Sequence, residues 1–332
     1  MEGLPIVDVG PLVTGEGDLA TMATAIDDAC RAFGFFYVSG HGVDEVLQHR
    51  LDAAAERFFT LPDADKAAIA MARGGRAWRG WFPLGGELTA GVADRKEGIY
   101  FGAELGPDDP RVRAGTPLHG PNLFPAQVPE LREAVLPYLQ AMTALGHRLA
   151  GGIALALGLE SGWFDRHLTA DPLTLFRIFR YPPVPAGADP SWGVAEHTDY
   201  GLLTILRQDH RGGLQVHAPH GWLEAPPVPG TFVVNLGDML ERMTGGRYRS
   251  TPHRVRNTSG EDRLSFPFFF DPAWEAEVLP VPRAGEGSAA ARARWDGEDV
   301  FAFTGTYGEY LLDKVGRVFP DLHQQVIEPE LS

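Results

Sequence analysis

The chain is poor in cysteine, and this excludes two common kinds of site. Cys30 is the only cysteine among 332 residues, so neither an intrachain disulfide nor a zinc cluster of several thiolates can form. Cys30 falls within an apolar helical pattern, and free cysteine is among the most buried residue types. We therefore expect Cys30 to be a small core residue and not a nucleophile.

Positive charge and long apolar runs are also scarce. Lys and Arg total 29 against 44 Asp and Glu, for a net charge of -15, and such a surface repels nucleic acid and anionic lipid. The longest apolar run, Leu149 to Leu159, is too short to span a bilayer. The first residues lack the charged and apolar regions of a signal peptide. We expect a cytoplasmic protein with no nucleic-acid or membrane partner.

Helical patterns dominate the first half of the chain. Apolar residues recur three or four apart over residues 18–33, 43–59 and 129–157, and again over 307–326. Pro137 lies inside the third stretch and predicts a kink or a break. Between Gly74 and Gly106 the pattern gives way to a Gly-rich loop containing tryptophan, the kind of segment in which substrate contacts tend to lie.

After Leu173 the chain becomes rich in short strands separated by Gly, Pro, Asp and Asn. The expected strands are 173–181, 202–208, 214–217, 231–235, 253–256 and 264–270. This spacing is typical of a β-sandwich or barrel. Helices followed by strands predict a β core flanked by helices, with the change near residues 160–172.

Two histidines and one aspartate form the candidate metal site. His197 and Asp199 are two residues apart, so on a strand both side chains face the same side. His253 follows on a later strand. Two His and one carboxylate that leave coordination positions open are the facial triad of non-haem iron oxygenases.

A candidate anion clamp follows the last of these ligands. Arg263 and Ser265 are again two residues apart, and the apolar run after them indicates a buried strand. A buried arginine needs an anionic partner, and its guanidinium binds a carboxylate through two donors.

Taken together, these motifs resemble the iron(II)/2-oxoglutarate-dependent dioxygenases of the isopenicillin N synthase-like family over nearly the whole chain. The residues that carry the resemblance are Ile6-Val7-Asp8, residues 34–43, Arg180-Tyr181-Pro182-Pro183, residues 197–201, residues 213–216, Asn235-Leu236-Gly237-Asp238, residues 250–255 and Arg263-Leu264-Ser265.

The resemblance implies a mainly β fold with flanking helices, whose core is a distorted double-stranded β-helix (jelly roll). It implies that His197, Asp199 and His253 bind Fe(II) and are catalytic, while Arg263, Ser265 and Tyr181 bind 2-oxoglutarate. Phe179 departs from the Asn that plant members carry. We expect one compact structural unit: residues 1–125 as the N-terminal helix/strand region, 126–172 as core-flanking helices, 173–275 as the jelly-roll core and 276–332 as the C-terminal helical segment.

The implied activity is hydroxylation, desaturation or cyclisation of a small-molecule substrate. Fe(II), 2-oxoglutarate and O2 would generate an iron(IV)-oxo, with release of succinate and CO2. We expect a monomer or weak homo-oligomer.

Further motifs resemble the microbial members of the family, among them the bacterial ethylene-forming enzyme: residues 86–91, 111–115, 119–121 and 243–246, and Arg317 before Phe319-Pro320-Asp321. This implies that Glu87, Thr89, Tyr200 and Arg317 lie around the substrate. Alternatively, Glu87 and Thr89 only stabilise their own loop, Tyr200 is a packed aromatic, and Arg317 is on a solvated helix face.

Three other functions stay open. An oxidase of the same fold would use iron and O2 without 2-oxoglutarate, and Arg263 and Ser265 do not exclude it. A zinc hydrolase could use the same three ligands. The third is a jelly roll that only binds a ligand. Metal analysis and 2-oxoglutarate-dependent oxygen uptake separate these functions.

Overall fold

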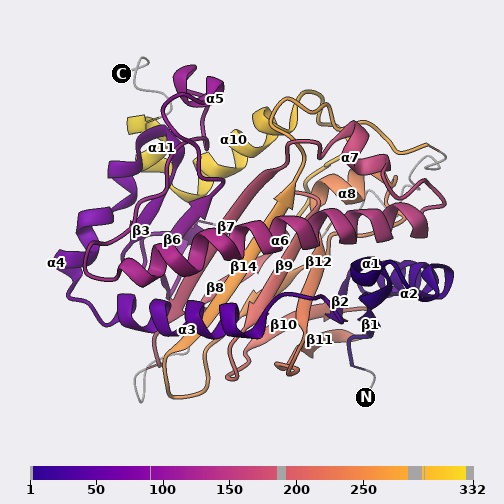
Figure 1. The fold of residues 1–332 in the computed structure, drawn as a ribbon, viewed down its shortest axis with the longest axis horizontal. Coiled ribbons are helices and arrows are strands. Elements are labelled where there is room, and N and C mark those ends of the chain that lie inside the picture. The colour runs from indigo at the N-terminus through magenta and orange to yellow at the C-terminus, as the bar shows by residue number, and fades with distance from the viewer. Residues whose placement is uncertain (1–2, 90, 185–191, 283–293, 295, 327–332) are drawn as a thin grey trace.

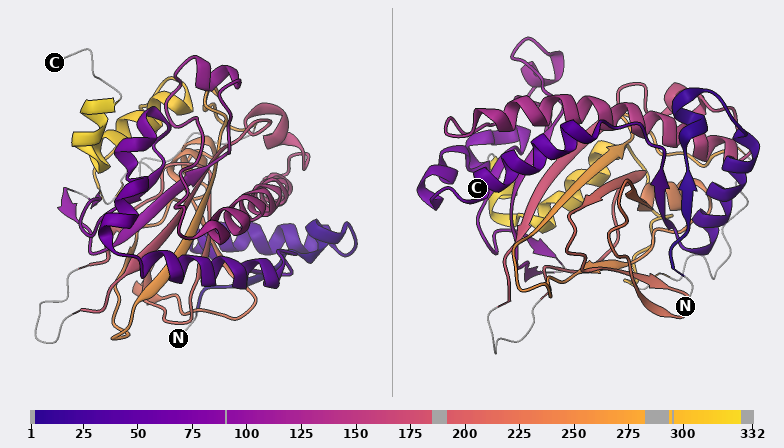
Figure 2. Two further views of the ribbon diagram at one scale, coloured as in Figure 1. Left: turned by 60° about the vertical axis from the view of Figure 1, so that its left-hand side comes forward. Right: turned by 60° about the horizontal axis from the view of Figure 1, so that its bottom comes forward.

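The computed structural model describes residues 3–89, 91–184, 192–282, 294 and 296–326. Two β-sheets lie face to face, and the long helices cover the outer face of the larger sheet (Figures 1 and 2). This is the jelly-roll arrangement with flanking helices that the sequence predicts. The space between the two sheets holds the candidate site.

The larger sheet has eight strands, among them β7 and β14, the first and last strands of the β-rich half. In spatial order these are β1 (Ile6–Asp8), β2 (Phe35–Ser39), β12 (Phe232–Leu236), β9 (Leu203–Gln208), β14 (Arg263–Asp271), β7 (Leu173–Tyr181), β6 (Glu97–Gly102) and β3 (Gly80–Phe82). The smaller sheet has four, in the order β11 (Gly221–Glu224), β10 (Leu214–Ala218), β13 (His253–Val255) and β8 (Val194–His197). A short hairpin joins β4 (Leu88–Thr89) and β5 (Val92–Ala93).

The helices are α1 (Gly10–Thr14), α2 (Leu19–Ala32), α3 (Glu45–Phe59), α4 (Asp63–Lys66), α5 (Pro110–Arg113), α6 (Pro129–Ala156), α7 (Trp163–His167), α8 (Asp238–Met243), α10 (Tyr307–Val318) and α11 (Pro320–Val326). Cys30 on α2 is fully buried, as predicted. In the part of the chain that the structure describes, no helix has both the length and the apolar composition needed to cross a membrane.

Strand β7 shows how the major sheet divides core from cavity. Leu175, Arg177, Phe179 and Tyr181 alternate along it and line the cavity between the sheets. The residues between them face outward, where the ring of Phe176 packs against Tyr138 of α6, with ring centroids 5.1 Å apart. One strand therefore supplies both the helix-facing core and the floor of the site.

Helix α6 runs without interruption from Pro129 to Ala156, so the predicted break at Pro137 is wrong. Proline removes one backbone donor and crowds the preceding turn. The neighbouring residues Val135 and Tyr138 are fully buried against the sheet. Their packing holds the helix together through the proline, because tertiary contacts contribute more to a protein helix than propensity does.

The segment from Gly74 to Gly106 is not wholly a loop, which corrects the sequence prediction. It contains β3 and the fully buried β6, which extend the major sheet. The glycines conceal the pattern because they stand where neighbours fill the space: a Cβ at Gly98 would lie 2.6 Å from the ring of Phe179. Similarly, the predicted helical stretch 307–326 is two helices, because Pro320 begins a new one after Phe319.

Candidate active site

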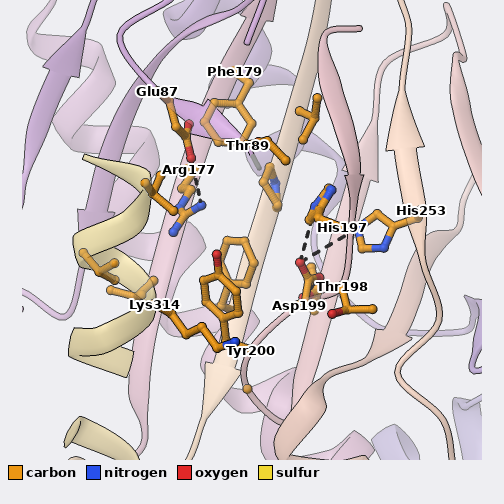
Figure 3. A pocket seen from close by; sticks show the side chains of 18 of the residues that line it. Glu87, Thr89, Arg177, Phe179, His197, Thr198, Asp199, Tyr200, His253 and Lys314 are labelled. Atoms are coloured by element: carbon orange, nitrogen blue, oxygen red, sulfur yellow. Dashed lines mark hydrogen bonds and ion pairs between the residues drawn. The ribbon is translucent and has the colours of Figure 1, made fainter. Parts of the chain in front are cut away.

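Three predicted ligands meet between the sheets (Figure 3). His197 on β8 and His253 on β13 stand directly opposite each other in the strand pairing. The Nε2 atoms of both imidazoles lie 3.8 Å from Oδ1 of Asp199. One ligand atom from each residue lies within 4.8 Å of the others, which is a separation that a single metal ion can bridge.

Asp199 reaches this point from a loop and not from a strand, which corrects the sequence prediction. Strand β8 ends at His197, two residues earlier. The carboxylate is fixed instead by two donors to its Oδ2: Asn235 Nδ2 at 2.7 Å and the hydroxyl of Thr204. These two residues are direct partners across β12 and β9. Oδ1 is therefore left facing the imidazoles.

The protonation of the three groups suits a metal. The Nδ1 atoms of His197 and His253 lie 2.8 and 3.2 Å from the carbonyls of Ala195 and Thr251, so Nδ1 donates and Nε2 keeps its lone pair. Burial lowers the pKa of both histidines. Burial alone would raise the pKa of Asp199, but the two histidines and its two donors lower it below the usual range. Two neutral imidazoles and a carboxylate are ligands for iron(II).

The three residues predicted to bind 2-oxoglutarate are neighbours on β14 and β7. Arg263 on β14 is fully buried, and its Nε donates to the carbonyl of Gly212. Its Nη1 and Nη2 atoms are buried with no partner among the described residues. Ser265 and Tyr181 line the cavity beside it, and the ring of Tyr181 lies 4.9 Å from the guanidinium carbon. A buried cation with two donors unpaired among the described residues favours an acidic ligand, and 2-oxoglutarate fits this requirement.

The candidate substrate residues line the same cavity, which has a volume of about 390 Å³. Glu87 is buried, accepts a 2.6 Å hydrogen bond from Tyr100 and lies 3.1 Å from Lys96 Nζ. Thr89 donates to Asp94 at 2.7 Å. Both side chains therefore have partners within the protein already.

Tyr200 and Arg317 occupy different depths of this cavity. Tyr200 is partly buried, and its ring lies 5.8 Å from Lys314 Nζ. The side chain of Arg317 is 58% exposed and pairs with Glu298 and Asp313 at 2.7 Å each. Arg317 therefore lies at the rim of the cavity with a solvent-exposed side chain, and its contact with a substrate stays a prediction.

Sequence reasoning missed several polar residues of the cavity. Among them are the buried Lys96 and the half-buried Arg177, both near Glu87, and Asn235 and Thr204, which hold Asp199. The two-residue alternation over 173–181 was a usable signal for Arg177, since it places this residue on the same face as Tyr181. Asn235 stands in a motif that carries the family resemblance, but that motif does not indicate a contact with Asp199, and no comparable signal marks Thr204.

A jelly roll that brings two histidines and a carboxylate into one cavity, with a buried arginine behind the cavity-lining Tyr181, is the arrangement of a non-haem iron oxygenase. Comparison with known proteins places the chain more narrowly: it belongs to the 2OG-Fe(II) oxygenase superfamily, whose model matches residues 172–272. Residues 4–127 match the model described as non-haem dioxygenase in morphine synthesis N-terminal. The protein is thus a 2-oxoglutarate- and iron(II)-dependent oxygenase, as predicted.

Two curated relatives and one solved structure illustrate the similarity. A probable iron/ascorbate oxidoreductase of Dictyostelium discoideum is 46% identical, with 98% of each chain covered. A 1-aminocyclopropane-1-carboxylate oxidase of Dictyostelium mucoroides is 36% identical over 97% of this chain and 96% of its own. The crystal structure of a full-length Neurospora crassa protein in complex with alpha-KG is 25% identical, with a TM-score of 0.77 over 94% of this chain and 96% of that one.

Proposed function

We propose that His197, Asp199 and His253 hold the iron and that Arg263 and Ser265 bind the distal carboxylate of 2-oxoglutarate. The observation that carries this assignment is the fully buried guanidinium of Arg263, whose two terminal nitrogens have no partner in the described chain. It lies on the same cavity-facing strand as Ser265. Leaving such a charge unpaired is costly, so a site of this kind indicates a diacid ligand.

Bound iron(II) supplies the activation of dioxygen at the expense of 2-oxoglutarate. The protein's own residues orient the metal ligands and keep water out of the site. Asn235 and Thr204 keep one oxygen of Asp199 directed at the metal position, and the carbonyls of Ala195 and Thr251 fix the two imidazoles. Tyr181 covers the guanidinium of Arg263 and offers its hydroxyl to the distal carboxylate of 2-oxoglutarate.

The test is succinate formation with oxygen uptake, which we expect to require both iron(II) and 2-oxoglutarate. Arg263→Gln should raise the KM for 2-oxoglutarate by at least about tenfold and leave iron affinity unchanged, because it removes a charge-assisted pair. Arg166→Gln, at an exposed ion pair on α7, is the control and should change neither quantity. Oxygen uptake that is independent of 2-oxoglutarate would favour an oxidase, and a zinc-dependent hydrolysis would favour the hydrolase.

We also propose that a small-molecule substrate lies over the iron between the Glu87 segment and α10. Glu87, Thr89, Tyr200 and Arg317 line that part of the cavity. Replacing Glu87 or Arg317 should raise the substrate KM while 2-oxoglutarate affinity stays nearly constant, and equal losses in both would count against this placement. We further propose a cytoplasmic enzyme of secondary metabolism that is monomeric or weakly oligomeric, and the net charge of -15 argues against a nucleic-acid partner.

A further inference from the structure

One end of the cavity has several hydrogen-bond donors and no acceptor for them. Trp78 and Arg79 both line it, and each side chain is only 1% exposed. The indole Nε1 of Trp78 and the Nε and Nη1 of Arg79 are buried without any hydrogen-bond partner in the described chain. Buried donors of this kind are rare in folded proteins and require an explanation.

The guanidinium of Arg79 lies over the inner face of the major sheet. A Cβ added to Gly102 would lie 1.9 Å from Arg79 Nη2, so glycine leaves the space that the guanidinium fills. Gly102 on β6 pairs with Leu175 on β7, and two residues along Tyr100 pairs with Arg177. Arg79 is therefore a neighbour of Arg177 on the cavity side. Its single hydrogen bond runs from Nη2 to the carbonyl of Leu118, at 2.8 Å.

Arg177 adds a second cation that is only partly neutralised. Its guanidinium lies 4.2 Å from the ring centre of Tyr100, and its Nε has no hydrogen-bond partner in the described chain. The carboxylate beside it is that of Glu87, whose Oε1 is 3.6 Å from Arg177 Nη1 and accepts the hydrogen bond of the Tyr100 hydroxyl. Its other oxygen lies against Lys96. Arg177 thus shares Glu87 with Lys96 and Tyr100.

The charge at Arg79 is accordingly unfavourable when the cavity holds no ligand. Burial lowers the pKa of Arg79 to about 9, with Glu104 opposing this shift and Arg177 adding to it. Arg79 forms no ion pair among the described residues, and Glu104 pairs with Arg132 instead. An anion placed between the two guanidiniums would relieve both the desolvation and the mutual repulsion.

The backbone around this end is also unusual. In the described part of the chain, Trp78 and Leu118 are the two residues other than glycine with positive φ, at 55° and 64°. Both line the cavity here, and each such conformation is strained for a residue with a side chain. Strained residues of this kind concentrate at ligand sites. The strain fixes the indole and presents the carbonyl that orients Arg79.

We propose that Trp78, Arg79 and Arg177 form a second anion subsite, which binds a carboxylate on the substrate that is oxidised. The inference rests on the proposed function, because it assumes that this cavity holds the substrate. The proposed subsite is distinct from the clamp for 2-oxoglutarate. Arg263 pairs with Tyr181 at one end of β7, and Leu175 lies six residues away at the other, about 20 Å along the strand. One small diacid cannot occupy both.

The test uses the enzyme with iron and 2-oxoglutarate bound under anaerobic conditions, so that the first clamp is filled. The probes are matched pairs that differ only in their charge, such as phenylacetate with phenylacetamide, and hexanoate with hexanamide, with phenyl phosphate added. Binding is measured by calorimetry and by the shift in Tm. We expect the acid to bind at least about tenfold more tightly than its amide.

Arg79→Met removes the charge but retains most of the volume, and it should abolish this preference for the acid. Arg73→Met, at an exposed residue of the same segment, should retain it. Should Arg79→Met fail to fold, Trp78→Phe should weaken acid binding several-fold and leave amide binding unchanged. Equal binding of acid and amide to the parent enzyme, or an unchanged preference in folded Arg79→Met or Trp78→Phe, overturns the subsite. Tighter binding of phenyl phosphate overturns its assignment to a carboxylate.

The fate of the proposed function is measured separately. Succinate formed slowly without any substrate reports on the use of 2-oxoglutarate alone, and Arg73→Met should leave it and the KM for 2-oxoglutarate unchanged. If no succinate forms in the parent enzyme while its preference for acids remains, the proposed function fails and the subsite stands.

Discussion

At the scale of single residues, the site depends on how the two oxygens of Asp199 are divided. Asn235 and Thr204 both donate to Oδ2, and Oδ1 alone faces the two imidazoles. The side chains of Asp199, Asn235 and Thr204 are all buried. Because rotation of the carboxylate would break both hydrogen bonds, the ligand is oriented before a metal arrives.

We therefore predict that Asn235→Ala weakens iron(II) binding by about 10- to 100-fold, the usual effect of removing a group that orients a metal ligand. Anaerobic titration with iron(II) measures the affinity directly. Asn122→Ala is the matched control, since Asn122 is an equally buried asparagine that donates to Gly102 and Glu104, away from the metal. Similar iron affinities in both variants would show that the hydrogen bond to Asp199 has no such role.

Residues with a local signature could be predicted, and residues that act through strand register could not. The motifs of His197, Asp199 and His253, and of Arg263 with Ser265, are visible in the sequence; the structure brings the three ligands together and places Arg263 and Ser265 on one strand. Thr204 and Asn235 meet Asp199 only because β9 and β12 pair in one register. Arg79 meets Arg177 only because Gly102 leaves room. Neither fact is visible in a single segment.

At the scale of elements, the contact between α6 and β14 sets the spacing between the helical layer and the sheet. Gly146 lies on the buried face of α6, directly against the ring of Phe270. A Cβ at this glycine would lie 2.3 Å from the ring, which is itself fully buried and cannot move aside. Since β14 also carries Arg263 and Ser265, the same contact fixes the depth of the proposed clamp.

We predict that Gly146→Ala lowers the free energy of unfolding by about 1–3 kcal/mol, the usual cost of overpacking a core. Gly152→Ala on the same helix gains the same helix propensity of about 1 kcal/mol, but its new Cβ would meet only the ends of the Ile26 and Leu12 side chains, 2.9 Å away. The free energy of unfolding should therefore fall less in Gly152→Ala than in Gly146→Ala. Denaturant unfolding of the two variants compares them, and equal losses would contradict the argument from Phe270.

The elements themselves were predictable where their periodicity is uninterrupted. Strands β7 and β14 and helices α2, α3 and α6 lie within two residues of the predicted ranges. Strands β3 and β6 were missed because Gly98 and Gly102 leave gaps that side chains of other segments fill. The predicted break at Pro137 failed for a related reason, since packing against the sheet outweighs the local preference of proline.

At the scale of the whole molecule, distant parts of the chain contribute to one cavity. Its lining includes Trp78 and Glu87 from the first third, β7 and β8 from the middle, and Tyr307 and Phe319 from the last helices. Phe319 closes one end by packing edge-on against Trp78 and Tyr100. The cavity therefore depends on how the C-terminal segment is attached to the β core.

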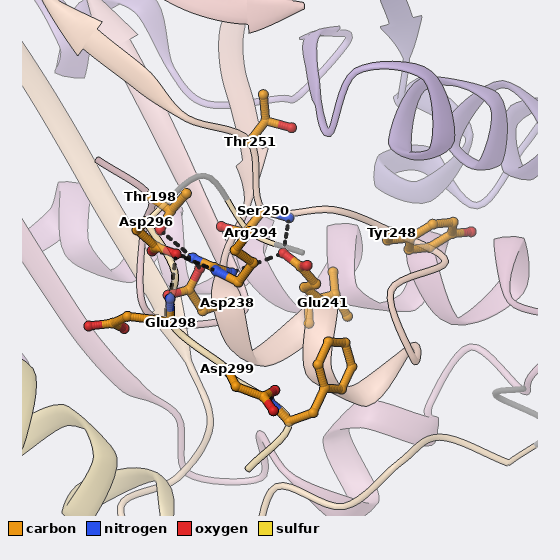
Figure 4. Close-up of polar contacts among 12 residues, drawn as sticks. Thr198, Asp238, Glu241, Tyr248, Ser250, Thr251, Arg294, Asp296, Glu298 and Asp299 are labelled. Carbon is orange, nitrogen blue, oxygen red and sulfur yellow. Dashed lines mark hydrogen bonds and ion pairs between the residues drawn. The ribbon is translucent and has the colours of Figure 1, made fainter. Parts of the chain in front are cut away.

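Arg294 makes the main polar attachment of that segment (Figure 4). Its side chain is 4% exposed and pairs with Asp238 at 3.0 Å and Glu241 at 3.1 Å, both on α8. It also donates to the hydroxyl of Thr198, at 2.9 Å, between two of the proposed metal ligands. The backbone N–H of Asp238 donates to the carbonyl of Asp199, at 2.8 Å. The buried guanidinium of Arg294 thus joins the C-terminal segment to α8 and to the loop that carries Thr198 and Asp199.

We predict that Arg294→Met lowers the stability of the whole molecule, by about 3–5 kcal/mol at pH 8, because it leaves two buried carboxylates unpaired. Arg166→Met, at an exposed ion pair, should cost less than about 1 kcal/mol. Calorimetry should show one transition moved to lower temperature. A separate early transition, with the main one unchanged, would mean that the C-terminal segment unfolds independently.

The deficit of Arg294→Met should also depend on pH. Burial raises the pKa of Asp238, and that of Glu241 to about 7, while Arg294 opposes both shifts. Without Arg294 both values rise further, so the folded variant retains protons that the unfolded chain releases above about pH 4–4.5. Stability of the variant therefore falls as the pH rises through this range and beyond, and its deficit should be smaller at pH 5 than at pH 8. A deficit that is constant across that range would show that Arg294 contributes by packing and not by neutralising Asp238 and Glu241.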